Sequence, residues 1–148
     1  MSDTIQPKQY LCVKIDKFEL AIPVLNIIEI IIADERAGIF KPDADNQDIY
    51  SYRDMQIPLI NLLNILDISA QNTQLSGRII ICENGPDKAA LLADSADEIL
   101  RLDKNNISDL PTQLAGIKSD YLSGSISVDE RSINILSLDR LIRSIPAR

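Results

Sequence analysis

Short segments in which apolar and polar residues alternate run along most of the chain. Alternation with a period of two is typical of half-buried β-strands, and turn residues separate the segments. In the first half we predict strands over residues 10–15, 18–22, 27–33, 49–52 and 56–60. In the second half we predict strands over 78–82, 88–93, 98–102, 121–128 and 132–136. Leucines that recur on one side predict short helices over 61–66 and 137–143.

The stretches between these segments are polar and predict loops. Residues 34–48 hold Gly38, Pro42 and five acidic residues, which favours a solvated loop. Residues 1–8 form a loose polar leader before one domain over 9–148, and the polar linker 71–77 is the best subdomain boundary. The expected subdomains are therefore the two sequence halves, about 9–70 and 78–136.

The two halves can be laid over each other. At an offset of 69 residues, Leu11 falls on Ile80, Glu29 on Glu98 and Ile30 on Ile99. At an offset of 76, residues 57–62 fall on 133–138, because the extra residues lie in the intervening loops. Such a repeat is expected of two similar small β-barrels, each ending in a short helix.

The composition favours sheet over helix. The chain has 25 isoleucines but only 2 phenylalanines, 4 tyrosines and no tryptophan. A β-branched side chain is stiff at χ1 and packs well on a pleated surface. With 148 residues the chain can bury a core without disulfide or metal staples. The predicted fold class is all-β.

Charge and segment lengths restrict the possible partners. The formal net charge of −7 and the scarcity of aromatic rings argue against nucleic-acid binding. Residues 20–33, the longest apolar run, are too few to span a bilayer, and residues 1–7 lack the features of a signal peptide. Cys12 and Cys82 each lie within an apolar run and are expected to be buried, reduced thiols. A cytoplasmic protein is the simplest interpretation.

Catalytic and metal chemistry find little support in the sequence. There is no histidine to serve as a base or metal ligand, and no glycine-rich phosphate loop or Cys-x-x-Cys pair is present. Asp43 and Asp45 resemble the start of a calcium loop, but Asp48 stands where that loop needs glycine and Asp54 where it needs glutamate. We expect no enzyme activity, no cofactor and no metal site.

The order of the segments resembles the CheW-like domain family of chemotaxis coupling proteins. The resemblance covers about residues 9–142 and rests on motifs whose order and spacing match together. They are the segments 18–23, 27–30, 52–62, 92–100, 121–124 and 137–142. One departure is Asp54, which stands where the family usually has glycine.

The resemblance implies a fold of two small five-stranded SH3-like barrels that share a hydrophobic seam. It also implies a non-catalytic adaptor that couples the cytoplasmic tip of a chemoreceptor to the regulatory domain of a CheA-type histidine kinase. The positions that the family match assigns to partner binding are Val24, Ile27, Glu29, Arg53, Ile79, Ala89 and Ile99. Among these, Ile79, Ala89 and Ile99 are expected to line the seam.

Plainer interpretations stand beside these assignments. Arg53 could be an ordinary surface residue in a turn, and Val24, Ile27 and Ile30 could be core, because periodicity reports burial and not function. Glu29 interrupts a run of isoleucines, so we expect Glu29 and Arg53 to be exposed while their neighbours are packed. A small-molecule-binding β domain that uses the seam as a pocket is the alternative function.

Overall fold

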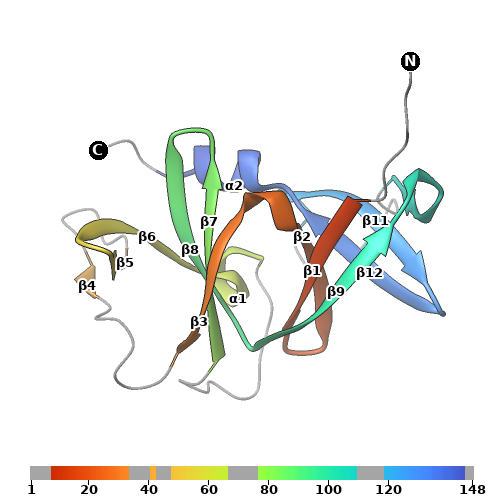
Figure 1. Ribbon diagram of the computed structural model, residues 1–148, viewed down its shortest axis with the longest axis horizontal. Coiled ribbons are helices and arrows are strands. Elements are labelled where there is room, and N and C mark those ends of the chain that lie inside the picture. Colours follow the sequence, from red (N-terminus) through yellow and green to blue (C-terminus); the bar gives the residue numbers. More distant parts are fainter. Residues whose placement is uncertain (1–7, 34–40, 43–47, 67–76, 110–118, 146–148) are drawn as a thin grey trace.

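The protein is built from two curved β-sheets that lie side by side (Figure 1). The structure, a computed structural model, describes residues 8–33, 41–42, 48–66, 77–109 and 119–145. One sheet has the strand order β10-β11-β12-β2-β1-β9, and we call it barrel A. The other has the order β4-β5-β6-β8-β7-β3, and we call it barrel B.

The strands of barrel A come from both ends of the described chain. They are β1 (Lys8–Ile15), β2 (Phe18–Pro23), β9 (Ser95–Leu102), β10 (Ile107–Ser108), β11 (Leu122–Val128) and β12 (Arg131–Leu136). Barrel B is continuous in sequence and comprises β3 (Ile27–Ala33), β4 (Lys41–Pro42), β5 (Asp48–Tyr52), β6 (Met55–Asn61), β7 (Gly77–Asn84) and β8 (Asp87–Ala93). The helical segments among the described residues are η1 (Val24–Asn26), α1 (Leu62–Ile65), η2 (Lys104–Asn106) and α2 (Leu138–Arg143). None of the helices in the described ranges is long and apolar enough to cross a membrane.

The predicted strands and the all-β class are confirmed. Each sheet has five strands of five or more residues, together with one two-residue strand, β4 or β10. The residues between β2 and β3 form the 3-10 helix η1, and both short helices form close to their predicted positions. The calcium-like residues Asp43 and Asp45, the leader 1–7 and residues 71–76 of the linker lie outside the described residues.

The internal repeat is also present in the topology. When the strands of barrel A are replaced by their repeat equivalents, β1 by β7, β2 by β8 and β9 by β3, the strand order of barrel B results. Each barrel contains one antiparallel hairpin, β1–β2 in barrel A and β7–β8 in barrel B. The second strand of each hairpin pairs in parallel with another strand of its barrel, β2 with β12 and β8 with β6. The two barrels are therefore two copies of one strand arrangement.

The barrels do not, however, coincide with the expected sequence halves 9–70 and 78–136. Strands β1 and β2 belong to the first half of the sequence but pair with β9 and β12 of the second half. Strands β7 and β8 of the second half complete barrel B by pairing with β3 and β6. Alternation identifies strands but not their partners, so the exchange could not be detected from the sequence pattern.

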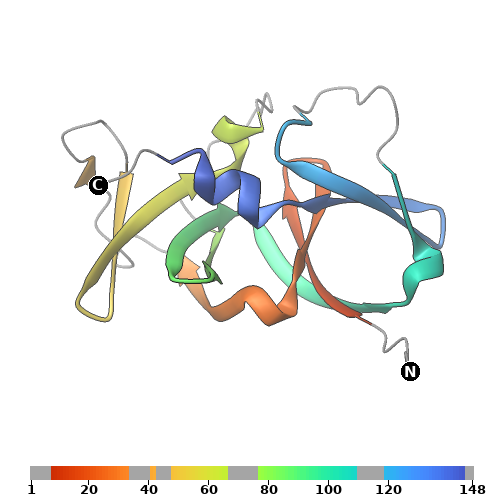
Figure 2. The same cartoon turned by 90° about the horizontal axis from the view of Figure 1, so that it is seen from above.

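Three buried apolar clusters hold this arrangement together. One fills barrel A and includes Cys12, Ala21 and Ile133, and a second fills barrel B and includes Tyr50, Tyr52 and Ile79. The third and largest, which we call the seam core, lies between the barrels. It joins side chains of both sheets with those of α1 and α2, which lies across the junction in Figure 2: Leu11, Val13, Ile15, Leu20, Ile22, Ile60, Leu62, Leu66, Ile80, Cys82, Ala89, Leu91, Ala93, Leu122, Leu136, Leu138, Leu141 and Ile142.

The chain crosses from barrel A to barrel B between β2 and β3 and returns to barrel A between β8 and β9. There the Asp94 backbone N–H donates to the Lys14 carbonyl at 2.9 Å. The Asp94 carboxylate accepts from the Asp16 backbone N–H at 2.6 Å, in the β1–β2 turn where Asp16 has a φ of 55°. Gly77 lies against this crossing, and a Cβ there would collide with the Ala93 carbonyl. The crossing strand is thus tied to the hairpin that it passes.

Because the seam core is shared, we expect the two barrels to unfold together. Leu91 on β8 is fully buried in the seam core, and Leu→Ala at such a site typically costs about 2–5 kcal/mol. Leu91→Ala should therefore lower the free energy of unfolding by that amount while a single cooperative transition is kept. Urea denaturation followed by circular dichroism and by tyrosine fluorescence measures both quantities. Two separate transitions in the wild type would contradict a shared core.

Candidate functional site

Glu29 lies at an irregularity of the edge strand β3. Ile27 faces Cys82 and Glu29 faces Ile81, so one extra residue is accommodated in β3 between these pairs. A β-bulge of this kind changes the direction in which the next side chain points. It places a carboxylate from an isoleucine-rich strand at the rim of barrel B.

Arg53 lies in the two-residue turn between β5 and β6. Arg53 has a φ of 46° and Asp54 a φ of 65°, and positive values at both central residues are the requirement of a type I′ hairpin turn. Aspartate tolerates this left-handed region better than most residues, which explains how Asp54 can replace the glycine usual at this position.

The structure brings the two predicted residues together. Arg53 Nη2 lies 3.1 Å from Glu29 Oε1, and the Tyr52 hydroxyl donates to the same oxygen at 2.7 Å. The Arg53 guanidinium also lies over the Tyr52 ring, 5.2 Å from its centre. The bond to the Glu29 carboxylate raises the pKa of Tyr52, because the phenolate would lose this acceptor and repel it. We call Glu29, Tyr52 and Arg53 the rim cluster of barrel B.

The two charged residues of the rim cluster are open to solvent, as expected, whereas Tyr52 is buried in the core of barrel B. The side chain of Arg53 is 71% exposed and that of Glu29 is 40% exposed. The expectation that their neighbours are packed is wrong, since Ile28, Ile30 and Met55 are also exposed. Val24 and Ile27 are half-buried against the seam core, and Leu25 in η1 is 96% exposed. Exposed apolar side chains thus lie close in sequence to both partners of an exposed ion pair.

The three positions expected to line the seam differ from one another. Ala89 is in the seam core but fully buried, so a partner cannot reach it in this conformation. Ile79 is equally buried and lies inside barrel B, so its placement in the seam was wrong. Adjacent residues of a strand point to opposite faces, and on β7 it is Ile80 that faces the seam. Ile99 on the edge strand β9 is 58% exposed.

Barrel A carries an equivalent cluster that the sequence analysis missed. Arg131, the first residue of β12, contacts Glu19 Oε1 at 2.6 Å and Glu98 Oε1 at 2.8 Å through Nη2. Its Nε and Nη1 make further bonds to the same two carboxylates, at 3.3 and 3.2 Å. Arg131 therefore links β12 to β2 and to β9 on the far side of β1. We call Arg131, Glu19, Glu98 and Cys12 the rim cluster of barrel A.

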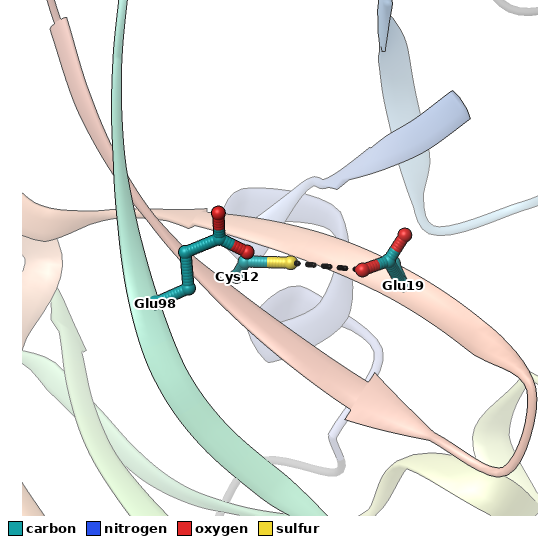
Figure 3. Close-up of side chains that lie close together, drawn as sticks. All are labelled: Cys12, Glu19 and Glu98. Atoms are coloured by element: carbon teal, nitrogen blue, oxygen red, sulfur yellow. Dashed lines mark hydrogen bonds between the residues drawn. The ribbon is translucent and has the colours of Figure 1, made fainter. Parts of the chain in front are cut away.

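The Cys12 thiol lies between the two carboxylates of this cluster (Figure 3). Its sulfur lies 3.7 Å from Glu19 Oε1 and 3.6 Å from Arg131 Nη2. Burial and the neighbouring Glu19 carboxylate raise the pKa of Cys12 to about 11, and burial raises that of Cys82 to about 12. Cys12, Glu19 and Glu98 are close enough to hold a metal ion, but the Arg131 guanidinium already binds both carboxylates. Both thiols are inert at neutral pH, since only a thiolate is reactive.

The two rim clusters are related by the internal repeat. Glu98 is the repeat equivalent of Glu29, and it also directly follows an irregularity in its strand, between the pairs Lys14–Ser95 and Cys12–Glu98. Asp129 and Glu130 repeat the turn of Arg53 and Asp54, with φ values of 47° and 68°. The match of Glu29 with Glu98 was therefore the signal that could have revealed the second cluster.

A comparison with known protein families decides what kind of protein this is. The model of the CheW-like domain matches residues 9–146. The chain belongs to the CheW-like domain family. Members of this family are non-catalytic adaptors and scaffolds of chemotaxis.

Individual CheW proteins are similar to this chain over nearly their whole length. The chain is 26% identical over 148 residues to the chemotaxis protein CheW of Thermotoga maritima. This match covers all of this chain and 96% of that protein. The crystal structure of the scaffolding protein CheW from Thermoanaerobacter tengcongensis superposes with a TM-score of 0.76 at 23% identity, over 89% of this chain and 90% of the other. The latter match confirms the two SH3-like barrels of the CheW fold.

The rim cluster of barrel A should make the stability of this CheW-like protein acid-sensitive. Hydrogen bonds from Arg131 lower the pKa values of Glu19 and Glu98 from 4.5. A lowered folded-state pKa stabilises the fold above the unfolded value and loses this contribution as the pH falls through the folded one. Arg131→Met should therefore lower the melting temperature at pH 7, and the deficit should shrink below pH 4.5.

The exposed Arg143, which pairs with Asp139 on α2, offers the control for this experiment. Arg143→Met should change the melting temperature little at either pH, because exposed helix pairs contribute little. Differential scanning calorimetry of the three proteins between pH 3 and 8 checks the difference. A deficit of Arg131→Met that is constant with pH would contradict the role of the carboxylates.

The turn beside Arg53 should tolerate the residue usual in the family. Asp54→Gly removes a side chain from a position with a φ of 65°, where glycine is unstrained but loses more conformational freedom on folding. The two effects oppose each other, so we expect the free energy of unfolding to change by less than about 1 kcal/mol. Asp54→Val, which a left-handed position disfavours, should be clearly destabilising. Chemical denaturation of both variants tests this.

Proposed function

We propose that the protein couples the cytoplasmic tip of a chemoreceptor to the regulatory domain of a CheA-type histidine kinase in the cytoplasm. The observation that carries the proposal is the rim cluster of barrel B. An arginine that is 71% exposed is held by a glutamate and an aromatic ring on a rigid turn, with exposed apolar side chains around it. Arginine is one of the residue types that are enriched among the residues that dominate binding energy at interfaces.

The receptor tip is assigned to the rim cluster and the adjoining surface of the seam. Val24 and Ile27 are half-buried there and Ile99 is exposed, so each has apolar surface left to offer. Ile79 and Ala89 are omitted from this surface because both are fully buried. A receptor segment with apolar residues and a hydrogen-bond acceptor for Arg53 would match it.

We assign the binding site for the kinase regulatory domain to an edge strand of one of the barrels. Unpaired backbone groups of an edge strand can be completed by a strand of a partner, which gives affinity through main-chain hydrogen bonds. The family match of the chain to CheW-like domains supports this role, since it places the protein among chemotaxis adaptors.

The small-molecule alternative finds no support among the described residues. The seam that would have formed a pocket is occupied by apolar side chains of both barrels and of α2, most of them at 0–2% exposure. The seam is therefore a packed core and serves to join the barrels.

Arg53→Ala should weaken receptor binding while the fold is kept. An exposed substitution usually changes the free energy of unfolding by no more than about 0.5 kcal/mol, whereas truncation of an anchoring arginine costs about 2 kcal/mol, roughly thirtyfold in affinity. Glu29→Ala should act in the same direction, because Arg53 and Tyr52 would lose their shared acceptor. Isothermal titration calorimetry with a receptor fragment measures the affinities, and thermal melts verify the fold.

The Arg143–Asp139 pair on α2 provides a matched control for this binding experiment. Arg143 is as exposed as Arg53, at 78%, and also pairs with one carboxylate. Arg143→Ala removes the same kind of pair away from the rim cluster, so it should leave the affinity unchanged. Equal affinities for wild type, Arg53→Ala and Glu29→Ala, with all proteins folded, would disprove the assignment of the rim cluster.

A further inference from the structure

The internal repeat supplies a comparison between the two edge strands, β3 and β9. The repeat relates Ile28, Ile30 and Ile32 of β3 to Asp97, Ile99 and Arg101 of β9. All six side chains are exposed. The two strands thus have the same place in equivalent barrels but carry different chemistry.

Strand β9 has the usual protection of an edge. Charged residues on an edge strand discourage pairing with other chains, and Asp97 and Arg101 flank Ile99 there. Strand β3 has no such protection on its outer face. Ile28, Ile30 and Ile32 are 37%, 42% and 64% exposed, and a six-residue run with five isoleucines and no proline is typical of a segment that pairs with other strands.

Among the described residues, the backbone of β3 has a strand partner on one side only. Within the described residues it is the end strand of its sheet, with β7 as its neighbour. It lies with η1 on the side of the molecule that faces the viewer in Figure 1.

We propose that β3 pairs with β3 of a second copy of this chain, antiparallel and about a two-fold axis through Ile30. This register places Ile28 opposite Ile32 of the other copy and Glu29 opposite its Ile31. Every carboxylate then faces an isoleucine. A register centred on Glu29 would oppose two carboxylates, which is destabilising. An isologous interface needs a self-complementary patch, and the pattern of this strand provides one.

A second copy fits β3 better than a charged partner. The one charged residue of β3, Glu29, is already neutralised by Arg53, so the strand offers little net charge by which to select a basic or acidic segment. The whole chain carries a formal net charge of −7, so two copies repel each other at a distance. Salt screens this repulsion, and the self-pairing should therefore strengthen with ionic strength. Docking of a basic partner would weaken under the same conditions.

Sedimentation equilibrium of the full chain alone, at several concentrations and at low and high salt, tests the proposal. The wild type should form a concentration-dependent dimer that tightens with salt. Ile30→Lys should abolish it, since the two lysines would meet at the axis. Ile99→Lys, the same change at the equivalent position of β9, should leave it intact. Circular dichroism verifies that both variants fold.

Cysteine cross-linking tests the register itself. Residues directly opposite each other in antiparallel strands have Cα atoms about 4.5–5.5 Å apart, close enough for a disulfide. With oxidised glutathione as the oxidant, Ile30→Cys should form a covalent dimer and Ile99→Cys should not. Cys12 and Cys82 are 3% and 0% exposed and should not take part.

A wild type that stays monomeric at all concentrations and salts would overturn the proposal, as would a dimer that Ile30→Lys leaves intact. A monomer whose binding to a kinase or receptor fragment is lost in Ile30→Lys would mean that β3 receives a different partner. The dimer is measured without any partner, so its absence would leave the proposed receptor contact of Arg53 untouched.

Discussion

The seam core between the barrels is the constraint on which the rest of the structure depends. Its side chains come from both sheets and from α1 and α2, and most are fully buried. A strand that contributes to the seam must bury both of its faces, one inside its barrel and one against the other barrel. This requirement explains why β1, β7 and β8 are almost wholly apolar in their middle portions. Polar residues are left for the turns, the edges and the barrel rims.

The two barrel rims use a similar glutamate–arginine contact in different surroundings. In both barrels a glutamate follows a bulge in an edge strand and meets an arginine at or beside a type I′ turn. In barrel A a second carboxylate, Glu19, and the thiol of Cys12 enclose the arginine, so the cluster joins three strands. In barrel B the equivalent position of Glu19 is Lys88, and Arg53 stays largely in solvent. The arginine of barrel A thus binds two carboxylates and joins strands, whereas that of barrel B binds one and stays exposed.

Alternation along the chain predicted nearly every strand, and the repeat predicted two related barrels. Alternation could not predict which face of a doubly buried strand points where, so Ile79 and Ile80 were indistinguishable. The exposure of Ile30 could not be predicted for the same reason, because β3 carries isoleucine on both faces. Glu29 and Arg53 were each identified as candidates, but their contact joins strands that only the fold brings together. The partners of Arg131 lie 112 and 33 positions away, beyond any local pattern.

The exchange of β1 and β2 has a consequence for the order in which the chain folds as it leaves the ribosome. Barrel B consists of consecutive strands and has all of them once Ala93 has been synthesised. The β1–β2 hairpin is made first, yet its neighbours in the sheet are β9 and β12, and β12 ends only at Leu136. The hairpin must therefore wait for strands that are synthesised later, β9 and then β12, before its own sheet is complete. The barrel that begins first is completed last.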